Sequence, residues 1–125
     1  MLLGLHTGTI MHTNLMTDIR VAKETGYDAI EFYIPKLVRY LDAGYRAEEL
    51  RPVLGSLRLA MINSFLHIER QDPDARRELS KQCERLCQVA QTLGCPSLQV
   101  VALNGLQGEP WSEIRSKVGQ SLAEL

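Results

Sequence analysis

The sequence predicts an α/β fold with a parallel sheet, because one pattern occurs four times along its 125 residues. Each repeat has a short apolar run typical of a strand, then polar residues, then a stretch with the apolar spacing of a helix. The four runs are Leu2–His6, Ala29–Tyr33, Leu59–Phe65 and Leu98–Leu103. Strands that alternate with helices form βαβ units, whose strands run parallel. Ligands bind at the carboxyl ends of such strands, so we expect any site there.

The composition is that of one globular domain, which we expect to span residues 1–125. The chain is 45% hydrophobic and 23% charged, so it can bury a core. Its net charge of -1 gives no electrostatic footprint for nucleic acid, and no apolar run has the length of a membrane span. The amino terminus does not resemble a secretory signal, and three cysteines favour reduced thiols. We therefore expect a cytoplasmic protein with neither nucleic acid nor a membrane as partner.

The first two units are bounded by residues that end strands and helices. Leu2–His6 is nearly all apolar, which predicts a strand covered on both faces. After a threonine-rich loop, the spacing predicts a helix over about 14–25, and Gly26 suits its left-handed C-cap. Ala29–Tyr33 is the second strand. The segment 35–45 is the least regular, with one short amphipathic helical turn that either covers the strand ends or is a surface excursion.

The third unit contains a proline within its first helical stretch. The spacing predicts a helix over 47–54, but Pro52 lies inside it and should kink or shorten it, because proline lacks a backbone donor. Gly55 is a plausible end of this helix. Leu59–Phe65 is then expected to form the third strand.

The clearest helix signal follows the third strand. Asp72 suits an N-cap and Pro73 the first helical position, while Gly94 ends the apolar repeat. Cys83 and Cys87 lie four residues apart in this helix. They are either a redox or metal pair or part of the apolar stripe, and we favour packing because buried thiols behave as small hydrophobes.

The last unit has a strand over 98–103, a turn at Asn104 and Gly105, and a helix that opens at Pro110 and Trp111. The apolar positions of this helix recur at helical spacing and are Trp111, Ile114, Val118, Leu122 and Leu125.

Three blocks of residues carry a resemblance to a known family. They are Gly4-Leu5-His6, the stretch Gly26-Tyr27-Asp28-Ala29-Ile30-Glu31, and Leu93-Gly94-Cys95-Pro96 before a strand that leads into Asn104-Gly105. Together, and in this order, they resemble the start of a xylose isomerase-like (β/α) barrel. That family includes sugar and sugar-phosphate isomerases, epimerases, inositol-catabolism enzymes and the endonuclease IV branch.

The resemblance implies half of a (β/α)8 TIM barrel, since a complete barrel has eight units and about 250 residues. It also implies an isomerase or epimerase that acts on a sugar, a sugar phosphate, a polyol or a related hydroxy-carbonyl compound. The family uses a divalent metal such as Mn, Mg, Zn or Co, but most of its ligands lie on later strands. We therefore assign no metal ligand and no catalytic residue in this chain.

Glu31 is the first candidate for a substrate-binding residue. A carboxylate on a buried strand is costly unless it has a partner. At the strand end it could accept hydrogen bonds from a polyol or act as a base, and the resemblance implies contact with substrate. The alternative is a carboxylate held in a salt bridge at the barrel rim.

Two histidines and two asparagines are further candidates. His67 follows the third strand beside Glu69 and could bind a metal or move protons, or it could be an ordinary loop histidine. His6 could bond a sugar hydroxyl or be a satisfied core histidine. Asn63 and Asn104 suit hydroxyl recognition, although for Asn104 we favour an ordinary turn.

A half barrel needs further strands to close. Its first and fourth strands would each have an unpaired edge and an apolar face, which favours association. We expect either a homodimer that completes the barrel or a chain truncated from a longer protein. The functional alternative to an isomerase or epimerase is a non-catalytic scaffold. The near-neutral charge disfavours DNA cleavage, and the lack of a phosphate-binding loop after the first strand disfavours a flavodoxin-like sheet.

Overall fold

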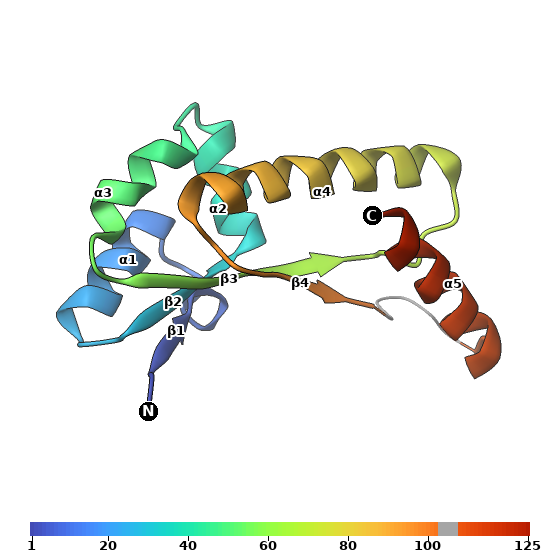
Figure 1. The fold of residues 1–125 in the computed structure, drawn as a ribbon, viewed down its shortest axis with the longest axis horizontal. Coiled ribbons are helices and arrows are strands. Elements are labelled where there is room, and N and C mark those ends of the chain that lie inside the picture. The colour runs from blue at the N-terminus through green and yellow to red at the C-terminus, as the bar shows by residue number, and fades with distance from the viewer. Residues whose placement is uncertain (103–107) are drawn as a thin grey trace.

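A computed structural model describes residues 1–102 and 108–125 and confirms four parallel strands in one sheet, in the order β1-β2-β3-β4 (Figure 1). The strands are β1 (Gly4–His6), β2 (Ala29–Tyr33), β3 (Arg58–Leu66) and β4 (Leu98–Val101). The α-helices are α1 (Leu15–Glu24), α2 (Ile34–Asp42), α3 (Leu50–Leu54), α4 (Pro73–Leu93) and α5 (Trp111–Glu124). Two short 3-10 helices, η1 (Thr7–Ile10) and η2 (Ala47–Glu49), complete the set in the described residues.

The core lies between the sheet and the helices that connect its strands. Figure 1 shows α2, α3 and α4 on one side of the strands, with α5 beyond the end of β4. Phe32 of β2 and Ile62 of β3 are fully buried in the same apolar cluster as Ile19 of α1 and Leu86 of α4. No helix in the described residues is long and apolar enough to cross a membrane.

The helix boundaries follow the expected capping chemistry. Asn14 caps α1, where its Oδ1 accepts the Thr17 N–H at 2.9 Å. Asp72 caps α4 in the same way, through the Ala75 N–H at 2.9 Å. Gly26 and Gly94 follow α1 and α4 with φ values of 78° and 68°, the left-handed conformation that glycine adopts without strain. The predicted ends of these two helices are confirmed.

The segment expected to be the least regular is instead the nine-residue helix α2. Pro35 lies in its first turn, where the missing N–H costs nothing, and Ile34 and Leu37 are buried against the core. Burial of this short apolar face therefore stabilises a full helix. The next stretch is divided into η2 and the five-residue α3, which contains Pro52, so the shortening expected there is confirmed.

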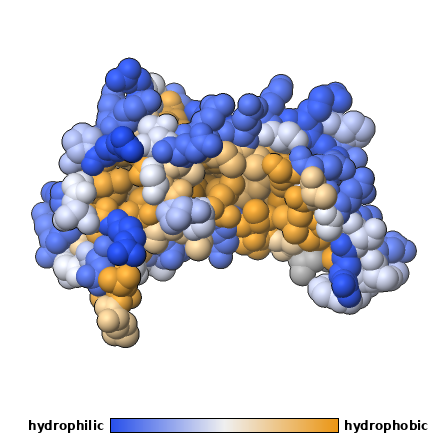
Figure 2. Space-filling model, viewed as in Figure 1, coloured by the Kyte–Doolittle hydropathy of each residue, from blue (hydrophilic) through white to orange (hydrophobic). Residues whose placement is uncertain are grey.

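Apolar side chains are exposed at both ends of the described chain, and the prediction that Leu2–His6 is a strand covered on both faces is wrong. The first strand begins at Gly4, and the side chains of Leu2 and Leu3 are 62% and 53% exposed. In α5 the apolar side chains of Trp111 and Leu122 are 63% and 52% exposed, and the only fully buried residue of that helix is Ser121. In both places no element of the described residues covers the apolar side chains. Figure 2 shows hydrophobic residues across the middle of this side of the molecule, bordered by hydrophilic ones.

The two helical cysteines have different surroundings, which corrects the expectation that both lie on the apolar stripe. Cys83 is buried, whereas Cys87 is exposed. A step of four residues turns an α-helix about 40° beyond a full turn, which takes Cys87 away from the core. Burial raises the pKa of the Cys83 thiol. The packing interpretation therefore holds for Cys83 alone.

Candidate functional site

Glu31 and Asn63 meet on the side of the sheet opposite to the helix-facing residues of β2. Ile30 and Phe32 are fully buried in the core, so alternation directs Glu31 and Tyr33 to the other face. Tyr33 pairs with Asn63 of β3, and Asn63 Nδ2 donates a hydrogen bond of 2.9 Å to Glu31 Oε2. Glu31 is half-buried and Asn63 fully buried. The carboxylate is therefore held by a neutral amide donor on the neighbouring strand.

His6 lies beside Glu31, because the two residues are register partners on β1 and β2. Its ring is fixed, since Nδ1 accepts the Gly8 N–H at 3.0 Å and the ring centroid lies 6.4 Å from that of Tyr33. A neutral imidazole that accepts through Nδ1 carries its proton on Nε2. His6 therefore offers an N–H donor next to the Glu31 carboxylate. The close approach also explains Gly8, where a Cβ would collide with the imidazole.

Two buried acceptor atoms lack a hydrogen-bond partner within residues 1–102 and 108–125. They are Asn63 Oδ1 and Glu69 Oε2. Buried polar atoms are almost always hydrogen-bonded, so an unpaired one marks a place where a donor from water or a ligand fits. Asn63 therefore fixes Glu31 with its amide group, and its Oδ1 is a buried acceptor without a partner in the described residues.

His67 lies in the turn directly after β3, at the carboxyl end of the sheet. Its φ of 64° is left-handed, a conformation that is uncommon for residues other than glycine but enriched in histidine. Its carbonyl accepts the Arg70 N–H at 3.2 Å, and its side chain is half-buried. The structure thus brings Glu31, His6 and Asn63 together and places His67 in the following turn. Asn104 lies outside the described residues.

Several residues that hold the strand ends carry no clear signal in the sequence. Thr7 is fully buried, and its Oγ1 accepts the Tyr33 N–H at 2.8 Å, which ties the loop after β1 to the end of β2. Lys36 of α2 forms a buried ion pair of 2.7 Å with Asp18 of α1. Nothing in the sequence marks that pair, because its members lie on different helices. Glu69 stands out in the sequence only as a neighbour of His67, since a carboxylate in a turn is normally exposed.

The described residues do not contain a metal site. No group of three or more His, Cys, Asp or Glu side chains in residues 1–102 and 108–125 is placed to hold an ion. A catalytic zinc ion usually takes three protein ligands. Glu31, Asn63 and His6 can accept and donate hydrogen bonds and hold a proton, but they do not supply such a ligand set.

Solved structures of similar fold include xylose isomerase-like proteins. The chain is similar to the IolI protein with a bound zinc atom, with a TM-score of 0.87 and 23% identity over 99% of this chain and 46% of that one. It is also similar to the probable 3-DHS dehydratase AsbF of Bacillus anthracis, with a TM-score of 0.79 and 18% identity over 99% of this chain and 46% of that one. A xylose isomerase domain protein of Alicyclobacillus acidocaldarius gives a TM-score of 0.76 and 21% identity over 97% and 43% of the two chains.

These likenesses establish the fold. The chain spans about half the length of the structures it matches. No family model and no curated protein matches the sequence. The predicted resemblance is therefore confirmed as a likeness in fold: the chain has the architecture of about half of a xylose isomerase-like TIM barrel.

Proposed function

We propose that this chain provides a substrate-binding half of an isomerase or epimerase that acts on a sugar, a polyol, a sugar phosphate or a related small hydroxy-carbonyl compound. The observation that carries the proposal is the Asn63–Glu31 hydrogen bond, with His6 as the register partner of Glu31 on the neighbouring strand. These three side chains combine a carboxylate, an amide and an imidazole. They match the donors and acceptors of adjacent hydroxyl and carbonyl oxygens.

Each side chain has a separate part in this proposal. Glu31 accepts a hydrogen bond from a substrate hydroxyl and is placed to take a proton next to a carbonyl. Asn63 holds Glu31 in position through its amide, and it acts on the substrate through Glu31 because its own side chain is fully buried. The Nε2–H of His6 donates to a carbonyl or hydroxyl oxygen. His67 contributes from the turn after β3, and Asn104 remains a candidate of the same kind.

A metal takes no part in the steps assigned to this chain. The IolI structure holds zinc, but the described residues here do not form a ligand set of their own. An ion that acts with this site therefore needs ligands from beyond these residues, and divalent Mn, Mg, Zn or Co are the candidates.

We also propose that β1 and β4 bind four further βα units, which would close an eight-stranded barrel around the site. The units come from a second copy of this chain or from the rest of a longer one. The single pairing of each of these strands in the described sheet supports the proposal, because open edges favour strand addition.

Ligand binding and turnover test the function together. Aldoses, ketoses, their phosphates and cyclic polyols are added to the purified chain, with and without each divalent ion, and the melting temperature and product are measured. We expect one compound class to raise the melting temperature, because a ligand of the folded state stabilises it. Glu31→Gln should remove that shift, whereas Glu84→Gln, an exposed carboxylate on α4, should keep it. A shift that survives Glu31→Gln would rule out the site.

A second candidate function is a non-catalytic scaffold with the same fold. The absence of a three-ligand group from the described residues favours it. A folded chain that binds a polyol without converting it, with every ion tested, would support this candidate over the enzyme.

A further inference from the structure

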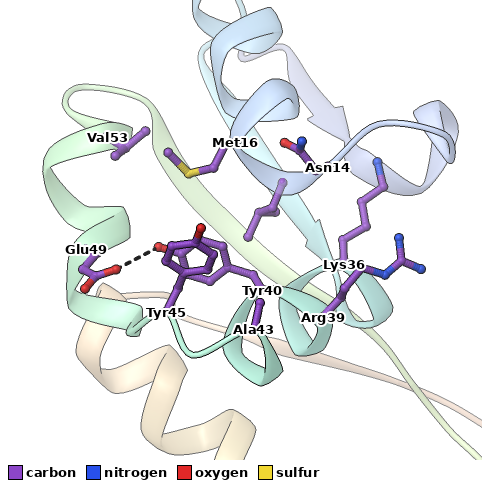
Figure 3. A pocket seen from close by; sticks show the side chains of 10 residues that line it. Asn14, Met16, Lys36, Arg39, Tyr40, Ala43, Tyr45, Glu49 and Val53 are labelled. Atoms are coloured by element: carbon purple, nitrogen blue, oxygen red, sulfur yellow. Dashed lines mark hydrogen bonds between the residues drawn. The ribbon is translucent and has the colours of Figure 1, made fainter.

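A second candidate binding site lies in the helical layer, apart from Glu31, Asn63 and His6. A cleft of about 510 Å³ opens between α1, α2 and the segment formed by η2 and α3 (Figure 3). This volume is within the range of small-molecule pockets, which are mostly apolar with a few converging polar groups. Neither Glu31, Asn63 nor His6 lines it.

Aromatic and aliphatic side chains form the centre of the cleft. The rings of Tyr40 and Tyr45 are stacked, with centroids 4.9 Å apart and planes inclined by 20°. Leu15, Met16, Ala43 and Val53 complete the apolar lining. Tyr45 is 55% exposed and Met16 40% exposed, so folding leaves their faces uncovered. A flat ring fits such a surface, because aromatic faces and polarisable sulfur favour contact with aromatic groups.

Most charged groups that line the cleft already have partners. Lys36 Nζ donates to the Ile10 carbonyl at 2.7 Å, to Thr13 Oγ1 at 3.1 Å and to Asp18 Oδ2 at 2.7 Å, which uses its three protons. Arg39 differs, since no ion pair engages it within the described part of the chain.

The acidic group of the cleft is also engaged. Glu49 lies 3.8 Å from the Arg46 guanidinium and accepts the Tyr40 hydroxyl proton at 3.4 Å. Burial, together with the negative charge of Glu49, raises the pKa of the Tyr40 phenol, so that it stays a neutral donor. The charge left without a partner is therefore the positive one on Arg39.

The polar groups are divided between the two ends of the cleft. Figure 3 shows Asn14, Lys36 and Arg39 at one end and Glu49 at the other. The Asn14 Oδ1 accepts the Thr17 N–H, so its Nδ2 protons remain available as donors. An anionic group would thus meet Arg39 and an amide donor at the end of the cleft that is remote from Glu49.

We propose that this cleft binds a small planar aromatic carboxylate. The ring packs against Tyr45, Tyr40 and Met16, and the carboxylate pairs with Arg39 and accepts from Asn14. This site is separate from the one that carries the proposed function, so either can exist without the other.

Binding of trans-cinnamate, measured by isothermal titration calorimetry and ligand-observed NMR, tests the proposal on the full chain. We expect Arg39→Ala and Tyr45→Ala each to weaken binding by about tenfold, because each removes a charged or aromatic partner. Tyr45→Phe keeps the ring and should bind as the native chain does. Arg20→Ala removes an exposed arginine of α1 that is outside the cleft, and it serves as the matched control.

Two analogues and one further variant test which group of the cleft selects the ligand. Cinnamyl alcohol that binds as tightly as cinnamate would overturn the role of Arg39. Cinnamylamine that binds more tightly would overturn the proposal by showing that Glu49 selects a cation. Absence of cinnamate binding to the native chain would also overturn it. Glu31→Gln should leave cinnamate binding unchanged, and a loss there would place the probe at the strand ends instead.

Discussion

The two central strands and the two edge strands of the sheet differ in how completely their side chains are covered. β2 and β3 each pair with two neighbours in the described sheet, and Phe32 and Ile62 on them are fully buried. β1 and β4 each pair with one neighbour, and Val100 on β4 is 37% exposed. An apolar strand therefore has buried side chains in the centre of the sheet, whereas a strand of the same type at the edge has partly exposed ones.

The polar residues of the candidate site differ in the same way in how many neighbours hold them. Glu31 and Asn63 lie on β2 and β3, so packing on both sides fixes the backbones from which they project. His6 lies on an edge strand and depends on a local bond to Gly8. The central strands of the sheet therefore hold Glu31 and Asn63 firmly. Further groups of the site would come from units that pair with the edge strands.

The largest expected effect is the cost of truncating a central side chain. Phe32→Ala should lower the free energy of unfolding by about 3–5 kcal/mol, because it removes a fully buried ring and leaves a cavity. Val100→Ala at the edge should change it by about 0.5 kcal/mol or less. Urea unfolding of the two variants and the native chain measures both values.

A milder central variant keeps this comparison usable when Phe32→Ala does not fold. Ile30→Val should cost about 0.5–1.5 kcal/mol, since it deletes one buried methylene. Equal losses for Ile30→Val and Val100→Ala would mean that β4 is covered in solution, which contradicts its description as an open edge.

The contrast between centre and edge also separates what the sequence predicts from what it does not. The parallel βα repeat, the caps at Asn14 and Asp72 and the strand Ala29–Tyr33 follow from local patterns, and the structure confirms them. The exposure of Leu2 and Trp111 does not follow, because burial depends on neighbours that a local pattern cannot specify.

The site shows the same limit. The repeat predicts the parallel strands that carry Glu31 and Asn63, and the structure confirms these strands, although Glu31 is the middle residue of β2 rather than its end. It does not give their hydrogen bond, which depends on the register between β2 and β3. The left-handed backbone of His67 and the burial of Glu69 depend on tertiary packing around the turn, for which no sequence signal exists.

Association of two copies through an edge strand can be measured directly. If a second copy of this chain covers β4, light scattering after size-exclusion chromatography should give the mass of a dimer. Val100→Lys should raise the dissociation constant by about tenfold or more, because a charge on an edge strand opposes strand addition. Gln91→Lys adds the same charge on the exposed side of α4 and should leave the mass unchanged.

A native chain that is a stable monomer at every concentration would count against a second copy as the partner. A dimer that persists in Val100→Lys would instead place the interface away from β4, and the exposed apolar residues of α5 would be the next surface to test.

The smallest expected effect on stability is that of Gly8→Ala. The Gly8 N–H orients the ring of His6, which lies on the edge strand β1. Gly8→Ala places a Cβ against the His6 ring, which must turn and lose its bond to the Gly8 N–H. That loss costs about 0.5–1.5 kcal/mol, and the reduced freedom of the unfolded chain offsets about 0.4–1 kcal/mol of it.

Nitrogen NMR shifts should show the Nε2–H form of His6 in the native chain and its loss in the variant. Gly119→Ala, where a Cβ meets open space, should leave the His6 signals unchanged, and an unaltered tautomer in Gly8→Ala would mean that another group orients this ring.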